Sequence, residues 1–270
     1  LVGSEMCIRD SYEGAPLPIT AYLSVSSKAT GFVALIVLLT KVFESSGQSW
    51  GVILAIVAGA TMTLGNLVAL QQSNPVRLLA YSSISQAGFI IAPLAVSGIT
   101  GNYQDGIFAS VTYLIIYAFM NIGAFLSVHL FTNFTKSDNF YEWGGIAKHS
   151  PLTGVLTTVF FFSLAGIPPL GGWFAKFVVF RSLLSTGEII GISLAIVGAI
   201  NAVIALVYYA RISKVIWMDE LKNPEEEKSF EFQSPLKVVG ALTVLITFVA
   251  GIFPGIFSYL GEVSSIFFGN

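Results

Sequence analysis

Long apolar runs occupy most of this 270-residue chain. About 20 helical residues, each rising about 1.5 Å, cross a hydrocarbon layer roughly 30 Å thick. Every run is close to or above that length, and an open sheet would leave backbone groups unpaired in lipid, so each run is predicted to be helical. The runs are Leu17–Phe43, Trp50–Leu70, Leu78–Val96, Ile107–Phe131, Leu152–Leu184, Ile189–Trp217 and Leu236–Tyr259.

The composition agrees with a membrane protein. The chain is 54% hydrophobic and 10% charged, whereas a soluble domain is about 25% charged. We therefore expect an all-α integral membrane protein with about seven transmembrane helices, surrounded by a lipid bilayer. The single cysteine, Cys7, excludes an internal disulfide and an iron–sulfur cluster. The sequence shows no metal-ligand spacing and no nucleotide-binding motif, and it suggests no nucleic-acid partner.

Basic residues predict the orientation, because cytoplasmic loops of membrane proteins are enriched in lysine and arginine. Loops on one side carry eight of them and the other side two, which places the loops after the second, fourth and sixth runs in the cytoplasm. The C-terminus then lies on the outer (periplasmic) side of a cell inner (plasma) membrane. The eight are Arg77, Lys136, Lys148, Arg211, Lys214, Lys222, Lys228 and Lys237, and the two are Lys41 and Arg181.

The first eleven residues differ from the rest of the chain. Residues 1–11 are polar and mixed in charge, and the apolar pattern begins shortly after them. We expect 1–11 to be a non-native leader and 12–270 to form one transmembrane domain with no inserted soluble domain.

Two lysines lie inside the apolar runs. Lys28 is about 16 Å along its helix from Leu17, near the middle of the hydrocarbon layer, and Lys176 lies within Leu152–Leu184. An ionisable group at this depth costs at least about 3 kcal/mol, so it indicates a functional site. The fifteen acidic residues lie outside the apolar interiors or at their edges.

The run Leu152–Leu184 is predicted to be discontinuous. It contains two consecutive prolines, which lack backbone donors and disfavour helix in the residue before them, and beside them three glycines that permit unusual backbone dihedrals. Lys176 then follows the break, beside the positive N-terminal end of the second half-helix. A simple kink that relieves excess length is the alternative. The predicted hinge residues are Gly166, Pro168, Pro169, Gly171 and Gly172.

Three ordered segments of the chain form a recognisable pattern. They are Tyr12–Pro18 leading to Ser26-Ser27-Lys28, Gly65-Asn66-Leu67 through Arg77–Ile84, and Ser163–Pro169 followed by Lys176. This pattern resembles the antiporter-like membrane subunits of NADH:quinone oxidoreductase (respiratory complex I), and subunit N in particular. A related subunit of that family typically has glutamate at the position of Lys176, so the resemblance to subunit N is the stronger one.

This resemblance implies a proton-translocating subunit built on inverted repeats, of which the chain is expected to be the second, C-terminal half. The first half, with its own broken helix, lysine and partnering glutamate, would precede it. Other membrane subunits of complex I are the implied partners. NADH, flavin, iron–sulfur clusters and quinone are expected elsewhere in the complex, with no cofactor and no redox chemistry on this chain.

Desolvation and neighbouring charge tune a buried lysine for proton exchange near neutral pH. We expect Lys28 to be a central relay and Lys176 to be the outlet-side donor. Hydroxyl and amide groups between them are expected to hold a water wire, although such groups also serve as interhelical packing contacts. These supporting residues are Ser82, Ser83, Ser85, Gln86, Thr112, Tyr113, Tyr117 and Asn121.

The chain departs from the family pattern at two positions. Val76 precedes Arg77 where a lysine is usual, and Gln86 replaces a histidine found in many relatives. Glutamine does not titrate near neutral pH, so Gln86 is expected only to orient water. A subunit of a multisubunit cation/proton antiporter is the main alternative function, followed by a structural scaffold and a stand-alone metabolite permease.

Overall fold

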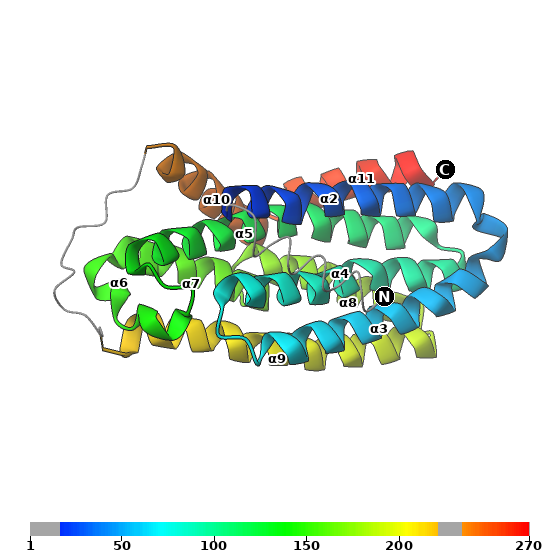
Figure 1. Ribbon diagram of the computed structural model, residues 1–270. Coiled ribbons are helices and arrows are strands. Elements are labelled where there is room, and N and C mark those ends of the chain that lie inside the picture. Colours follow the sequence, from blue (N-terminus) through cyan, green and yellow to red (C-terminus); the bar gives the residue numbers. More distant parts are fainter. Residues whose placement is uncertain (1–16, 221–233, 270) are drawn as a thin grey trace.

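The computed structural model describes residues 17–220 and 234–269, which form a bundle whose long helices run side by side (Figure 1). Helix α2 continues through a π-helical turn at Leu38–Val42, and 3-10 turns cover Glu44–Ser46 and Phe140–Trp143. The predicted leader, 1–11, lies outside the described residues. The helices are α2 (Leu17–Val37), α3 (Gly47–Ala69), α4 (Pro75–Thr100), α5 (Tyr103–Thr135), α6 (Ile146–His149), α7 (Pro151–Ala165), α8 (Gly171–Ser185), α9 (Ile189–Met218), α10 (Ser234–Ile252) and α11 (Gly255–Gly269).

The predicted all-helical membrane fold is confirmed. Helix α2 with its π-helical turn, and helices α3, α4, α5 and α9, are each long and apolar enough to cross a bilayer, and α10 with α11 makes a sixth candidate span as a bent pair. The predicted interruption within Leu152–Leu184 is also present, because α7 ends at Ala165 and α8 begins at Gly171. The chain is therefore a multi-pass membrane protein.

The prediction of one helix over Leu236–Tyr259 is wrong. The segment divides into α10 and α11, which meet at an angle of 84°. Pro254 supplies the reason, because proline lacks a backbone donor and disfavours helix in the residue before it, here Phe253. Both α10 and α11 pack against α5.

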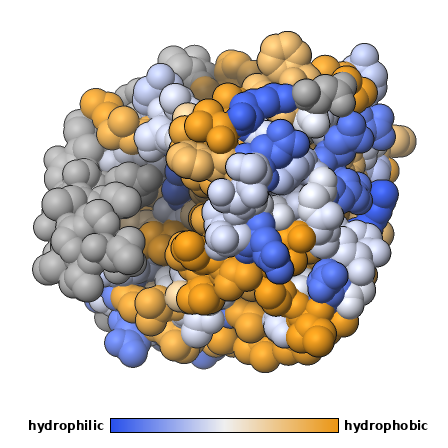
Figure 2. All heavy atoms as spheres, turned by 90° about the vertical axis from the view of Figure 1, so that its right-hand side faces the viewer, coloured by the Kyte–Doolittle hydropathy of each residue, from blue (hydrophilic) through white to orange (hydrophobic). Residues whose placement is uncertain are grey.

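Helices α4 and α5 form the buried centre of the bundle, whereas α2, α3 and α9 keep long apolar faces exposed. Ile56 on α3 and Val203 on α9 belong to these exposed faces, which are suited to contact lipid. Figure 2 looks onto the end of the bundle where α2 turns into α3, and hydrophilic residues gather there with hydrophobic ones along the lower edge. This pattern fits helices that end at a membrane surface.

Local capping explains why α4 is longer than the apolar run Leu78–Val96. Asn74 is the N-cap, and its side-chain oxygen accepts hydrogen bonds from the backbone N–H groups of Val76 and Arg77. Pro75 at the first helical position has the φ that a helix requires. At the other end Gly101 adopts a φ of 74°, a left-handed conformation that favours glycine.

The break between α7 and α8 packs directly on the end of α10. A Cβ at Gly251 would overlap the carbonyl group of Pro169, and a Cβ at Gly171 would lie 3.1 Å from the Thr247 carbonyl oxygen. Only glycine permits such a close approach of backbones. The α7–α8 break and the α10–α11 bend are therefore neighbours in the fold.

Glycine also sets the distance between α3 and α4. A Cβ at Gly65 would lie 2.7 Å from the backbone nitrogen of Ser85 and 2.9 Å from the carbonyl oxygen of Tyr81, whereas a Cβ at Gly31 on α2 would meet nothing within 4 Å. We expect Gly65→Ala to destabilise the protein by about 1–3 kcal/mol, because the two helices must separate. Gly31→Ala should leave stability unchanged or raise it slightly, since alanine favours helix.

Thermal unfolding of the two full-length variants in detergent measures the difference in stability between Gly65→Ala and Gly31→Ala. Equal melting temperatures for the two variants would contradict the close packing of α3 on α4.

Candidate functional site

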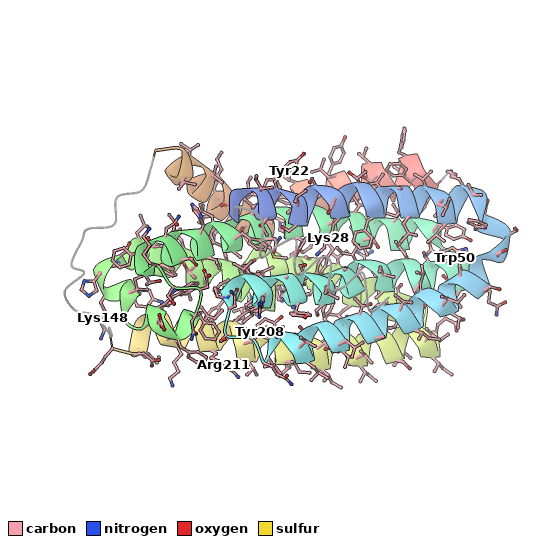
Figure 3. All side chains as sticks on the ribbon, viewed as in Figure 1. Tyr22, Lys28, Trp50, Lys148, Tyr208 and Arg211 are labelled. Atoms are coloured by element: carbon pink, nitrogen blue, oxygen red, sulfur yellow. The ribbon has the colours of Figure 1, made fainter. Side chains whose placement is uncertain are left out.

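Lys28 turns its ammonium group into the bundle. The nitrogen Nζ donates a hydrogen bond to the backbone carbonyl oxygen of Ser83 at 2.6 Å and a longer one to the Tyr117 hydroxyl at 3.4 Å. It also lies 5.2 Å from the centroid of the Tyr117 ring. Figure 3 shows Lys28 well inside the length of the bundle, between Trp50 toward one end and Lys148 at the other. The group is thus held at depth and away from either surface.

Lys176 on α8 is 5% exposed and reaches back across the helix break. Its nitrogen donates to the carbonyl oxygens of Ala165 at 2.6 Å and Leu164 at 3.1 Å, and lies 5.1 Å from the centroid of the Phe89 ring. These carbonyls belong to the last turn of α7, where a helix leaves acceptors unpaired and its dipole is negative. The ammonium group therefore contacts the negative end of α7, although the sequence placed it beside a positive end.

The residues of the break explain this geometry. Gly166 caps α7 with a φ of 98°, and a Cβ there would lie 2.8 Å from Cδ of Lys176. Gly172 packs against the Ser163 carbonyl so closely that a Cβ would overlap it, and its N–H donates to the Ser163 hydroxyl at 3.0 Å. Pro168 and Pro169 form the link between the two half-helices. The break is an ordered structure that surrounds the lysine, which a simple length-relieving kink does not require.

Gln86 of α4 connects the two lysine environments. Its Nε2 donates to the Leu164 carbonyl at 3.2 Å, the same oxygen that accepts from Lys176, and its Oε1 accepts from the Tyr113 hydroxyl. Tyr113 and Tyr117 are four residues apart on α5 and therefore share a face. Ser83 of α4 and Tyr117 of α5 thus contact Lys28. About one turn away on the same two helices, Gln86 and Tyr113 are hydrogen-bonded to each other, and Gln86 contacts the carbonyl that binds Lys176.

A polar branch leads from this region toward α3 and α9. The Ser82 hydroxyl is hydrogen-bonded to the Tyr209 hydroxyl, and the Tyr208 hydroxyl donates to Oδ1 of Asn66 at 3.0 Å. Asn66 donates in turn to Oδ1 of Asn201 at 3.0 Å. The sequence reasoning missed Tyr208, Tyr209, Asn66 and Asn201 as site candidates. Their position inside otherwise apolar runs was the feature of the sequence that could have identified them.

Three further predicted supporting residues lie outside both lysine environments and outside the polar branch. Asn121 donates to the Ser24 hydroxyl at 2.7 Å and so joins α5 to α2. The buried Thr112 hydroxyl has no hydrogen-bond partner within the described residues and faces Gly261 of α11. Ser85 is buried where α4 approaches Gly65. These residues support helix packing, the alternative that the sequence left open.

Within residues 17–220 and 234–269, the hydrogen bonds and ring contacts of Lys28 and Lys176 include no carboxylate. In the same part of the chain no group of three or more His, Cys, Asp or Glu side chains is placed to hold a metal ion. The arrangement offers two amines with neutral partners, which is suited to binding and releasing protons.

A family sequence profile described as NADH:quinone oxidoreductase/Mrp antiporter, TM, matches residues 5–204. The chain belongs to this family. It is 40% identical over 263 residues to NADH-quinone oxidoreductase subunit N 2 of Rhizobium meliloti, a match that covers 96% of this chain and 52% of the relative. It is also 39% identical to NAD(P)H-quinone oxidoreductase subunit 2 of Rippkaea orientalis, over 90% of this chain and 47% of that one. The chain spans about half the length of these relatives.

Solved structures show the same fold. A chain of respiratory complex I from Thermus thermophilus aligns with a TM-score of 0.71 and 25% identity, over 93% of this chain and 53% of the other. A chain of the Mrp complex from Dietzia sp. aligns with a TM-score of 0.82 and 20% identity, over 96% and 54%. The identification as an antiporter-like complex I membrane subunit is confirmed at the level of the family.

Gly166 and Gly187 form a matched pair for testing the break. Both have positive φ, 98° and 69°, so alanine is strained at either position, but a Cβ at Gly187 meets nothing within 4 Å. We expect Gly187→Ala to cost about 1–2 kcal/mol for its backbone conformation, and Gly166→Ala to cost more, because its Cβ also displaces the Lys176 side chain. Melting temperatures of the two full-length variants in detergent measure the difference. A smaller loss for Gly166→Ala would show that Lys176 does not lie against the break.

Proposed function

We propose that this chain is the proton-translocating membrane subunit of an NADH:quinone oxidoreductase, which relays protons through Lys28 and Lys176 while quinone is reduced elsewhere in the complex. The observation that carries this proposal is the arrangement of the two lysines. Each is held within the bundle by hydrogen bonds to backbone carbonyls, with no carboxylate among its contacts in the described part of the chain, and one turn of α4 and α5 separates the two sets of contacts.

The neutral surroundings of the lysines support proton exchange. An ion pair with a carboxylate stabilises the charged form of lysine and resists loss of its proton. Carbonyl oxygens accept a hydrogen bond from an ammonium group and from a neutral amine alike. Lys28 and Lys176 can therefore keep their positions as the proton comes and goes, which a repeated transfer cycle requires.

Transfer between the lysines runs along α4 and α5. Lys28 contacts the Tyr117 hydroxyl, and the Tyr113 hydroxyl contacts Gln86, which shares the Leu164 carbonyl with Lys176. The Leu164 carbonyl only accepts hydrogen bonds and Gln86 takes up no proton, so the proton travels through a wire of water that the two tyrosine hydroxyls and the Gln86 amide orient. Lys28 acts as the central relay, and Lys176 delivers the proton toward the outlet.

The proposed partners and cofactors are inferred from the names of the relatives. Several curated relatives are named as NADH-quinone oxidoreductase subunit N, so the partners are other membrane subunits of that complex. NADH, flavin, iron–sulfur clusters and quinone act in those subunits. The distribution of basic residues supports an orientation with the residues around Lys148 in the cytoplasm and the C-terminus on the outer side of the inner membrane.

Methionine variants test the relay. Methionine keeps much of the lysine stem and removes the titrating group, so packing is largely preserved. We expect Lys28→Met and Lys176→Met to slow proton transfer by about 10²–10⁴-fold, the usual contribution of a positioned acid–base group. Lys41→Met is the matched control, because Lys41 is exposed beyond the end of α2. The measurement is proton uptake per electron by the purified complex in liposomes. Native pumping by both inner variants at unchanged electron flow would refute the relay.

A subunit of a multisubunit cation/proton antiporter is the second candidate, because the Mrp complex has the same fold. The two are separated by affinity purification of the protein from its source membrane. We expect peripheral redox subunits to co-purify and the preparation to reduce quinone with NADH. Co-purification with antiporter subunits alone, without NADH oxidation, would favour the antiporter.

A further inference from the structure

Each lysine in the bundle lies over an aromatic ring. The nitrogen of Lys28 is 5.2 Å from the ring centroid of Tyr117, and that of Lys176 is 5.1 Å from that of Phe89. Each also has a backbone carbonyl oxygen at 2.6 Å. The same pair of partners, one carbonyl and one ring, thus recurs at two sites on different helices.

The Phe89 ring is fixed in place by its neighbours. The residue is 2% exposed, and its ring lies parallel to that of Tyr113 at a centroid distance of 6.0 Å. A Cβ at Gly198 on α9 would lie 3.3 Å from Cε1 of Phe89, so α9 closes on the edge of the ring. A ring held this firmly keeps its position relative to Lys176.

Within the described residues, the hydrogen bonds and the ring contact of Lys176 involve neutral groups. Helix α7 has no titratable residue, and Arg181, the other charged residue of α8, is exposed. Helix α5 presents the phenol of Tyr113, and α9 presents that of Tyr209 near α4. Arg211 of α9 donates to the carbonyl oxygen of Leu70 at the end of α3.

We propose that Phe89 is a positioning residue of the relay, whose ring face stabilises the charged form of Lys176 and so sets the pH range in which the relay works. This inference rests on the proposed function of Lys176. A cation within about 6 Å of a ring centroid is attracted by the negative face of the ring, and more strongly where water is excluded. Of the two lysine–ring pairs, the one between Lys176 and Phe89 isolates the effect of the ring better. Tyr117 also contacts Lys28 through its hydroxyl, whereas a phenylalanine side chain acts on a cation only through its ring.

Phe89→Leu tests the proposal, because leucine keeps an apolar side chain and removes the ring. The measurement is proton uptake per electron as a function of pH, with the complex in liposomes. Without the ring, charged Lys176 is less favoured, so we expect the alkaline limb of the profile to move to lower pH by about one unit, a tenfold change in the protonation equilibrium. Phe89→Tyr retains the ring face and should restore the native profile.

Phe160→Leu is the matched control, because Phe160 is a buried phenylalanine of α7 that packs on Gly123 of α5. It should leave the alkaline limb in place. The proposal would be overturned if the alkaline limb of the pH profile stayed in place in an assembled Phe89→Leu complex. It would also be overturned if Phe160→Leu shifted that limb by the same amount. If Phe89→Leu does not assemble, Phe89→Met is judged by the same criterion.

The lysine variants separate this proposal from the relay itself. Loss of pumping in Lys176→Met together with an unmoved limb in Phe89→Leu rejects the role of the ring and leaves the relay standing. Native pumping in Lys176→Met rejects the relay, and with it the reason to expect any effect of Phe89.

Discussion

The carbonyl oxygens at the end of α7 determine what Lys176 can do. Burying an ammonium group is costly unless its hydrogen bonds are satisfied, and the interrupted helix supplies two acceptors, from Leu164 and Ala165, where a continuous helix would have used them internally. The acceptors carry partial charge only, so they hold the side chain in both protonation states. The break, the buried lysine and the close glycine contacts around them form one structural unit.

Much of this unit was predictable because its signals are local. Length and hydropathy predicted the membrane-spanning runs, and Pro168 with Pro169 predicted the interruption. The bend at Pro254 had an equally visible signal, yet the apolar run continues past it, and hydropathy alone does not register a change of helix direction. Pro93 lies near the end of the apolar run Leu78–Val96 and yet sits inside the continuous helix α4, so a proline alone does not identify a break.

The partners of the lysines were not predictable in the same way. The Leu164 carbonyl is a backbone atom, and its role arises only where the chain leaves the helix. Tyr209 reaches Ser82 because α9 packs across α4, a contact between residues 127 positions apart. On α5, hydropathy cannot separate Tyr113 and Tyr117, which face the lysines, from Thr112, which faces α11. Choosing among polar residues of one helix requires knowing which neighbour covers each face.

The contact between Gly251 and Pro169 has a mechanical consequence. Since the backbone of α10 lies against the link between α7 and α8, an axial shift of α10 would displace that link. Such a shift would in turn move the Leu164 and Ala165 carbonyl oxygens that bind the Lys176 ammonium group, so the position of α10 and the geometry around this lysine are coupled.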